Sequence, residues 1–295
     1  MSAKPKQVQP DLLRGHKLGE SEFTFENRDV SLYSLGIGFN QDPLKEADFR
    51  FTYENDEFFS VFPTMPVVAI SNGIEGIFDC PGLPEFNPMM LLHGEQKIIS
   101  YKPIPVGTTC KTVSYVSDVA DKVKGALLTI TVSLTEGETR YADIVGKLFI
   151  RGIGGFGDKG YDNEVIPKVP EREPDFIAEE VTEKNRAVLY RLSGDINPLH
   201  IDPNMAALGG YKAPILHGLC TYGISAKAIY EKYCPGQPEE IKVMNARFTS
   251  HVFPGETLLV ETYQEGKFIH FETRTKERGK VVAMGFVELR QELKL

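Results

Sequence analysis

Two side chains suited to acid–base chemistry lie close together in a short stretch rich in turn-forming residues. Asp195 and His200 belong to the run Ser193-Gly194-Asp195-Ile196-Asn197-Pro198-Leu199-His200. Pro198 disfavours helical backbone at Asn197, so the run is predicted to be a loop. Loops fixed by rigid elements are common places for catalytic groups. A carboxylate and an imidazole that share one water can take a proton from it and later return a proton to a carbon atom.

A backbone donor further along the chain would complete such a site. Gly218 lies in Leu216-His217-Gly218-Leu219, at the predicted start of a long helix. The first N–H groups of a helix lack partners within it, and the helix dipole favours negative charge there. Glycine also lets a substrate carbonyl approach the backbone closely. Such a donor would stabilise negative charge that develops on a substrate carbonyl oxygen during a reaction.

The same residues have simpler structural interpretations. Glycine, aspartate, asparagine and proline are the usual turn formers, and spacing alone favours a capped turn at 193–200. His200 would then be a hydrogen-bonded structural residue, and His217 would anchor the start of the helix. A metal site built from Asp195, His200 and His217 is a third alternative. The spacing fits no common ligand pattern, so we predict no metal.

Helix signals flank the acid–histidine loop on both sides. Thr182 is predicted to cap a helix that continues to Leu192, and Gly194 is predicted to stop that helix. Asp202 is predicted to cap a second, short helix that begins at Pro203. The loop would therefore be held between two capped helices.

One long helix and two sets of strands make up much of the remaining chain. From Ile215 apolar residues recur three and four positions apart as far as Ile229, and Pro235-Gly236 ends the pattern. Runs rich in β-branched and aromatic residues, separated by turn residues, predict antiparallel strands. They occupy 112–117, 126–134 and 144–150 in the first half and 258–263, 268–273 and 281–289 in the second.

The strand sets suggest two weakly repeated halves joined by a linker. The stretch 152–157 is rich in glycine, and charged, proline-containing sequence follows it. We predict an N-terminal domain at 1–151, a linker at 152–174 and a C-terminal domain at 175–295. A long helix wrapped by an antiparallel sheet is a hot-dog fold. Two such halves, each with a long helix, would form an α+β double hot dog.

Composition excludes several classes of protein. Of the 295 residues, 41% are hydrophobic and 25% charged, which is ordinary for a globular protein. The net charge of −8 argues against a nucleic-acid binder, which needs a basic face. No apolar run reaches the length of about 18 residues that suggests a membrane span, so no membrane association is predicted. The four cysteines, at 80, 110, 220 and 234, fit no zinc pattern and are predicted to be reduced thiols.

The catalytic run also resembles a known signature. Residues 190–203, Tyr-Arg-Leu-Ser-Gly-Asp-Ile-Asn-Pro-Leu-His-Ile-Asp-Pro, closely resemble that of the type 2, (3R)-specific enoyl-CoA hydratases of the MaoC-like group. This group includes the hydratase part of the peroxisomal multifunctional enzyme of fatty-acid β-oxidation. The resemblance covers most of the chain from about residue 12. It extends over 214–221, 246–248 and 254–255 and, in the first half, over 92–96, 101–103 and 154–157.

The resemblance implies a role for each matching residue. It implies a double hot dog whose C-terminal half carries the catalytic groups, while the degenerate N-terminal half makes room for a long acyl tail. Asp195 and His200 match the catalytic pair, Asn197 matches the residue that supports their hydrogen bonds, and Gly218 matches the oxyanion donor. The positions that match substrate contacts are His93, Gly94, Lys122, Ile196, Pro198, Leu199 and Phe248. Lys122 is chemically suited to a CoA phosphate.

The implied reaction is the hydration of trans-2-enoyl-CoA to (3R)-3-hydroxyacyl-CoA in fatty-acid β-oxidation. The implied partners are an acyl-CoA substrate and a second copy of the chain, and no cofactor is expected beyond the CoA of the substrate. A peroxisomal location is expected, with the cytoplasm as the alternative. The terminal Leu293-Lys294-Leu295 resembles a peroxisomal targeting tripeptide at its last two positions. Two other functions stay open, namely a hot-dog thioesterase and a non-catalytic acyl-CoA carrier.

Overall fold

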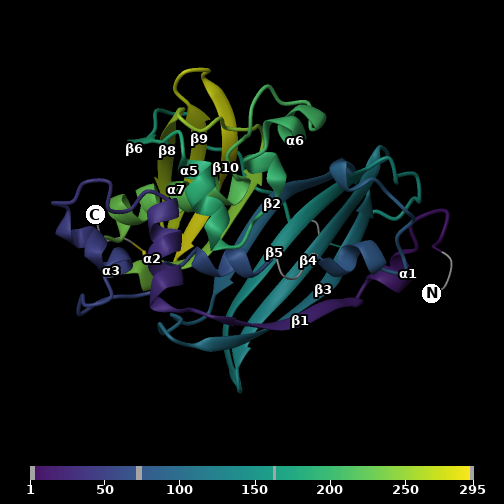
Figure 1. Cartoon of the computed structure of the whole chain (residues 1–295), viewed down its shortest axis with the longest axis horizontal. Helices are drawn as coiled ribbons and strands as arrows, with labels where there is room; N and C mark the ends of the chain where they lie inside the picture. Colours follow the sequence, from purple (N-terminus) through teal and green to yellow (C-terminus); the bar gives the residue numbers. More distant parts are fainter. Residues whose placement is uncertain (1–3, 71–74, 162–163, 293–295) are drawn as a thin grey trace.

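A single antiparallel sheet runs through the molecule (Figure 1). The computed structural model describes residues 4–70, 75–161 and 164–292. Within them, ten strands pair in the order β1-β3-β4-β5-β2-β7-β10-β9-β8-β6. Their bounds are β1 (Lys17–Thr24), β2 (Leu91–Ser100), β3 (Thr109–Asp121), β4 (Gly125–Glu136), β5 (Thr139–Arg151), β6 (Phe176–Val181), β7 (Ile241–Phe248), β8 (Thr257–Glu265), β9 (Phe268–Thr275) and β10 (Lys280–Leu289).

The six predicted strand runs are confirmed as parts of β3, β4, β5, β8, β9 and β10. Gly266 and Gly279 have φ of +59° and +63° and form the turns that join β8 to β9 and β9 to β10. The two halves meet where β2 pairs with β7, from Glu95 opposite Arg247 to Ile99 opposite Val243. The described residues between β5 and β6 contain no helix or strand.

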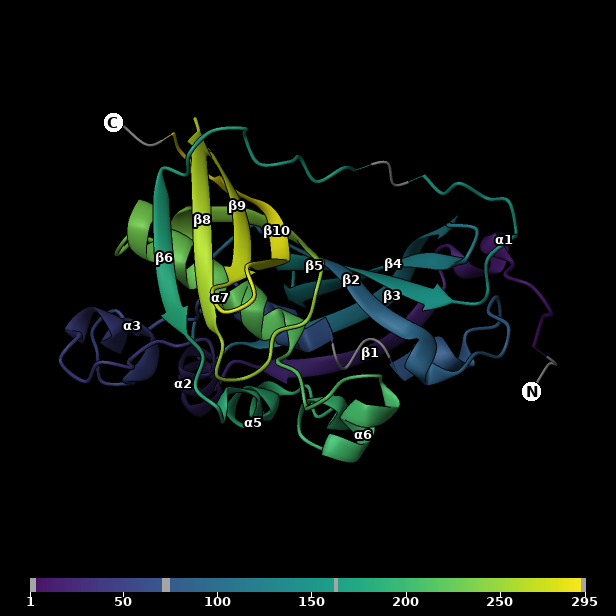
Figure 2. The ribbon, with the colours of Figure 1, turned by 90° about the horizontal axis from the view of Figure 1, so that it is seen from above.

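Helices lie against this sheet and around its edges (Figure 2). The α-helices are α1 (Pro10–Leu13), α2 (Asn27–Gly36), α3 (Phe49–Thr52), α5 (Arg186–Tyr190), α6 (Pro203–Leu208) and α7 (Gly218–Tyr233). Short 3-10 helices are η1 (Glu46–Asp48), η2 (Met65–Ala69), η3 (Glu75–Asp79), η4 (Pro88–Met90), η5 (Arg191–Ser193), η6 (Pro198–His200) and η7 (Pro238–Glu240). In the described parts of the chain, no helix is long and apolar enough to cross a membrane.

The long predicted helix is α7, which packs against the strands of the C-terminal half and is buried along nearly all of its length. It begins at Gly218 and ends directly before Cys234 and the Pro235-Gly236 turn, as its sequence pattern predicts. The two halves differ in their helices. The longest described helix of the first half is α2, with 10 residues, and the short η2 contacts β5. The N-terminal half thus lacks, among its described residues, a helix as long as α7.

The predicted cap of the helix before the acid–histidine loop is wrong. Asn185, not Thr182, directly precedes α5. Thr182 is fully buried, and its Oγ1 donates to Glu256 O at 2.6 Å and accepts from Gly255 N at 3.0 Å. A buried hydroxyl needs such partners, and the Pro-Gly turn before β8 supplies them. Thr182 therefore ties β6 to β8 and does not start a helix.

We expect Thr182→Val to destabilise the fold. Valine keeps the shape of the side chain but leaves the N–H of Gly255 without its partner, which costs roughly 1–3 kcal/mol. The free energy of unfolding from denaturant titration measures this loss. Thr275→Val is the matched control, because Thr275 is fully buried and its Oγ1 has no partner among the described residues. Equal stability of the two variants would contradict the role given to Thr182.

Candidate active site

The loop after α5 is shaped by its own side chains. Gly194 has φ of +128°, a conformation that favours glycine, and lets the chain turn after η5. The Asp195 carboxylate accepts from Asn197 N at 3.2 Å, and the Asn197 side-chain oxygen accepts from Leu199 N at 3.0 Å. Asn197 thus caps η6, the single turn that carries His200. The predicted loop is here a compact 3-10 turn.

Asp202 holds the other side of this loop, as predicted. Its carboxylate accepts from Asn204 N at 2.8 Å and caps α6, with Pro203 as the first residue of the helix. The caps on η6 and α6 fix the backbone on both sides of His200. The short-range signals in the sequence therefore determine the backbone that carries His200.

His200 is buried, with its ring oriented by a main-chain oxygen. Its Nδ1 lies 2.8 Å from Ile215 O. A carbonyl oxygen only accepts, so Nδ1 carries the hydrogen and Nε2 keeps its lone pair. Burial lowers the pKa of His200 below its ordinary value, while the bond to Ile215 and the charge of Asp195 act in the opposite direction. At neutral pH the ring is an uncharged base.

Asp195 lies beside this base. The carboxylate is partly exposed, and the side-chain ligand atoms of Asp195, His200 and His217 lie within 4.8 Å of one another. One water between the carboxylate and the imidazole can therefore contact both groups. This arrangement provides a place for proton removal and proton return.

Gly218 is the first residue of α7 and lines the same cavity. A Cβ added there would lie 3.4 Å from three atoms of the Phe248 ring, so the glycine permits close packing. His93 in turn contacts Phe248 edge-on, with ring centroids 5.4 Å apart. Gly94 falls at a bulge of β2, because the pairing with β5 shifts register between His93 and Glu95. Segments far apart in sequence thus form one wall.

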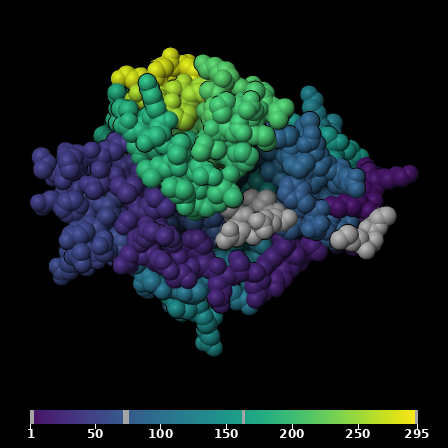
Figure 3. Space-filling model, in the orientation of Figure 1, coloured from purple at the N-terminus to yellow at the C-terminus, as the bar shows by residue number. Residues whose placement is uncertain are grey.

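The cavity has a volume of about 820 Å³ and is lined by both halves. In Figure 3 the green region around α6 lies opposite the blue segment of the first half, and the surface is hollowed between them. Its walls include eight of the predicted site residues. These are His93, Gly94, Asp195, Asn197, Leu199, His200, Gly218 and Phe248.

Three predicted substrate contacts do not line this cavity. Ile196 is 68% exposed and Pro198 is also exposed on the surface of the loop. Lys122 is exposed in the turn between β3 and β4. Sequence reasoning also missed residues that do line it, such as Tyr211 and His251, whose ring centroids are 5.0 Å apart. No local pattern joins these two residues, because they lie in separate loops.

The three clustered side chains do not suit a metal ion. The rings of His200 and His217 stack with centroids 3.7 Å apart and planes 28° apart. Each ring already uses one nitrogen on a main-chain oxygen. The remaining lone pairs lie in the planes of two closely stacked rings, so one ion at the usual distance of about 2.0–2.1 Å from both nitrogens would lie out of the plane of at least one ring.

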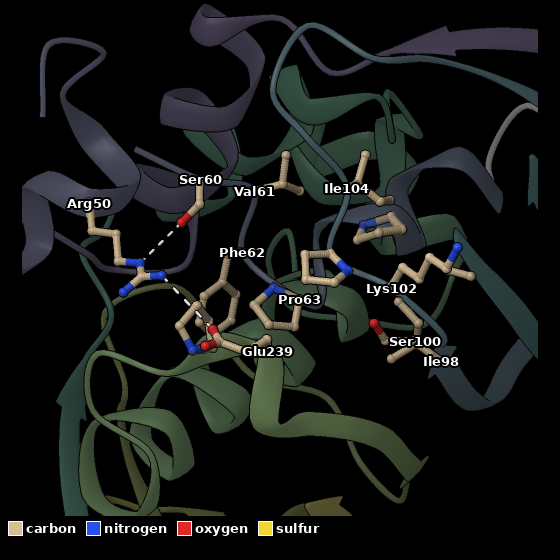
Figure 4. Close-up of a pocket in the computed structure, with 14 residues that line it drawn as sticks. Arg50, Ser60, Val61, Phe62, Pro63, Ile98, Ser100, Lys102, Ile104 and Glu239 are labelled. Atoms are coloured by element: carbon tan, nitrogen blue, oxygen red, sulfur yellow. Dashed lines mark hydrogen bonds and ion pairs between the residues drawn. The ribbon is translucent and has the colours of Figure 1, made fainter. Parts of the chain in front are cut away.

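A second, smaller cavity of about 70 Å³ is lined by the segment around α3, the end of β2 and η7 (Figure 4). Arg50 donates from Nε to Ser60 Oγ at 3.2 Å, and its guanidinium lies 3.9 Å from the Glu239 carboxylate. None of the predicted site residues is among the described residues that line it. We assign it no part in the chemistry of the larger cavity.

Two models of known protein families match this chain, one in each half. Residues 165–285 match the family model described as MaoC like domain, and residues 23–152 match the one described as MFE-2 hydratase 2 N-terminal domain. The chain is 38% identical over 311 aligned positions to the "Enoyl-CoA hydratase 2, peroxisomal" of Arabidopsis thaliana, with 98% of each protein covered.

Solved structures show the same architecture. A MaoC-like dehydratase from Phytophthora capsici superposes with a TM-score of 0.88 at 37% identity, covering 96% of this chain and 98% of that one. A Mycobacterium tuberculosis protein with a double hot-dog fold superposes with a TM-score of 0.54 at 12% identity, covering 98% and 97%, and bears on the fold alone. Together with the sheet that packs on α7, these likenesses confirm the predicted α+β double hot dog.

Proposed function

Since the chain belongs to the family of MaoC-like type 2 enoyl-CoA hydratases, we propose that Asp195 and His200 activate the water it adds and that Gly218 stabilises the thioester oxyanion. The chain is a hydro-lyase that hydrates enoyl-CoA in peroxisomal β-oxidation. One observation carries the residue assignment: the carboxylate, the neutral imidazole and the start of α7 share one cavity.

The proposed reaction begins with a water held between Asp195 and His200. The pair removes a proton as the water oxygen attacks C3 of the enoyl thioester. The electrons of the double bond move toward the thioester oxygen, and the N–H of Gly218 stabilises the enolate there. The proton then returns to C2, which completes the addition. The product is (3R)-3-hydroxyacyl-CoA. The (3R) configuration is inferred from membership in the family.

The acyl-CoA occupies the shared cavity in this proposal. Apolar walls from the first half, including Ile70, Leu148 and Phe149, suit an acyl tail. His93, Gly94, Leu199 and Phe248 contact the substrate near the reacting atoms. Ile196, Pro198 and Lys122 contact only those parts of the CoA that extend beyond the cavity. No cofactor is required besides the CoA of the substrate.

The remaining proposals concern organisation and location. The units are an N-terminal domain at 1–151, a linker at 152–174 and a catalytic domain at 175–295, and two chains form a homodimer. The enzyme acts in the peroxisome, as the name of its Arabidopsis relative supports. The terminal Leu293-Lys294-Leu295 lies outside the described residues. Transfer of these three residues to a fluorescent protein tests whether they direct peroxisomal import.

The pH dependence of kcat/KM tests the neutral state of His200. The base works only while Nε2 is unprotonated, and burial places its pKa below the ordinary value of 6.5. We expect kcat/KM for trans-2-enoyl-CoA to stay level as pH falls to 6.5 and to decline only below it. The decline follows from protonation of His200, so kcat/KM recovers when the pH is raised. An acidic limb centred above pH 6.5 would contradict the assigned environment.

The same burial makes a prediction for stability. Histidines with a lowered pKa in the folded state bind protons more readily when the chain is unfolded. His200 and His217 both have lowered pKa values because of burial. The free energy of unfolding should therefore be level above pH 6.5 and fall as pH decreases below 6.5. Denaturant titrations at several pH values measure this slope, and stability that rises toward pH 5 would contradict it.

A further inference from the structure

His217 contacts both members of the proposed catalytic pair. Its Nε2 lies 3.1 Å from the main-chain oxygen of Asp195. Its ring stacks on that of His200, with centroids 3.7 Å apart. The residue is 1% exposed and directly precedes Gly218, the first residue of α7. A single buried side chain therefore touches the loop of the acid, the ring of the base and the start of the helix.

The hydrogen bond and the low basicity of His217 favour a structural role over proton transfer. The Asp195 oxygen accepts, so Nε2 of His217 carries the hydrogen and Nδ1 has no partner among the described residues. Burial and, next, the adjacent His200 hold the pKa of His217 well below its ordinary value. Arg191 acts in the same direction, while Asp195 opposes it. The ring is therefore neutral at neutral pH, and its lowered pKa makes it a poor acceptor for a proton from water.

Aromatic side chains from both halves of the chain pack in a series that reaches His217. Tyr190 lies 5.1 Å from His217 between ring centroids, and Tyr33 of α2 lies 6.0 Å beyond Tyr190. Tyr33 is fully buried, and its hydroxyl lies 2.9 Å from Thr64 Oγ1. A continuous series of packed rings thus leads from α2 to His200. Close packing of this kind leaves the imidazole of His217 little freedom to move.

We propose that His217 is a positioning residue that sets the geometry of Asp195 and His200. The stacked ring holds the imidazole of His200, and Nε2–H holds the peptide of Asp195, so that both reacting groups face the same water. This inference rests on the roles proposed above for Asp195 and His200. The expected effect is large, because a displacement of about 1 Å in a catalytic group can reduce the rate about 100-fold.

Two substitutions separate the ring from the donor. His217→Phe keeps a flat ring and removes the donor, whereas His217→Gln keeps a donor of similar reach and removes the ring. We expect His217→Phe to lower kcat about 100-fold with KM changed less than about twofold, and the glutamine to restore part of the loss. His270→Phe is the matched control, because His270 is a buried histidine on β9 and does not line the cavity. Its kcat should stay near that of the natural chain.

A double-mutant cycle with Asp195→Asn tests whether His217 acts through Asp195. If it does, His217→Phe lowers kcat less than about tenfold in the Asp195→Asn background, because residues that act as a unit are not additive. An undiminished effect in that background overturns the inference. A normal kcat for His217→Phe while Asp195→Asn is nearly inactive also overturns the inference about His217, but it leaves the proposed function unaffected. A normal rate for Asp195→Asn overturns both the inference about His217 and the proposed role of Asp195. If His217→Phe does not fold, the same cycle is run with His217→Gln.

Discussion

Asp195→Asn is expected to lower kcat for trans-2-enoyl-CoA by roughly 10²- to 10⁴-fold, the range for loss of a general acid–base group. The carboxylate lies with His200 in one cavity, where a shared water can contact both groups. Asparagine keeps the size of the side chain and its oxygen, which can still accept from Asn197 N. The loop therefore keeps its shape while the water loses a proton acceptor. Loss of the conjugated absorbance of the substrate gives the rate.

A neighbouring acid provides the matched control for Asp195→Asn. Asp202 caps α6 through its side-chain oxygen, and asparagine caps helices as well as aspartate. Asp202→Asn should therefore keep a nearly normal rate. His200→Gln, which removes the base, should lose activity in the same range as Asp195→Asn. Near-normal rates for both site variants would show that the acid–histidine pair does not activate the water.

Gly218→Pro is expected to lose a further 10²- to 10³-fold in kcat relative to Gly218→Ala, the usual loss when one oxyanion donor is removed. Proline has no N–H, yet it is well tolerated at the first position of a helix. Gly218 holds that position in α7, and His217 before it has φ of −59° and ψ of 137°, which suits a residue before proline. The substitution therefore removes the donor with little strain on the helix.

Gly218→Ala controls for added bulk, because its Cβ would meet the Phe248 ring at 3.4 Å while the N–H remains. Gly19→Ala, on the edge strand β1, is the second control. Its Cβ would find only Ser114 Oγ, at 3.5 Å, and the rate should not change. Thermal unfolding of all three variants shows whether they fold. Equal rates for the alanine and proline variants at position 218 would contradict the role of this N–H.

The acid–histidine loop was predictable because its determinants are local. Gly194 turns the chain, Asn197 caps the turn that carries His200, and Asp202 caps the next helix. Each of these bonds joins residues within a few positions of each other, so residue type and spacing were sufficient. The long helix α7 was predictable for the same reason. The regular spacing of its apolar residues and the Pro-Gly pair after it both lie within one continuous stretch of sequence.

Contacts between distant segments were not predictable from spacing. His200 is oriented by Ile215 O and stacked on His217, and both contacts need residues 201–216 to return to the loop. Thr182 looked like a helix cap because threonine often is one, but its partners are at Gly255 and Glu256. A hydroxyl that bonds across the sheet has no local signature.

Four strands lie outside the six predicted runs, and three of them, β1, β6 and β7, lack a local signal for a related reason. The edge strands β1 and β6 pair on one side only and carry mixed polar sequence, so neither shows a strong apolar run. β7 follows the Pro-Gly turn after α7 and lies at the centre of the sheet, where its pairing with β2 joins the halves. That pairing depends on the first half, which no pattern within β7 can indicate.

The most direct test of the account is the reaction of the purified chain with trans-2-enoyl-CoA, followed by separation of the product enantiomers. We predict loss of the conjugated absorbance and accumulation of (3R)-3-hydroxyacyl-CoA, with no free CoA released. Formation of the (3S) product would contradict the proposed stereochemistry. Release of free CoA from saturated acyl-CoA, without hydration of the enoyl thioester, would contradict the central claim and favour a thioesterase.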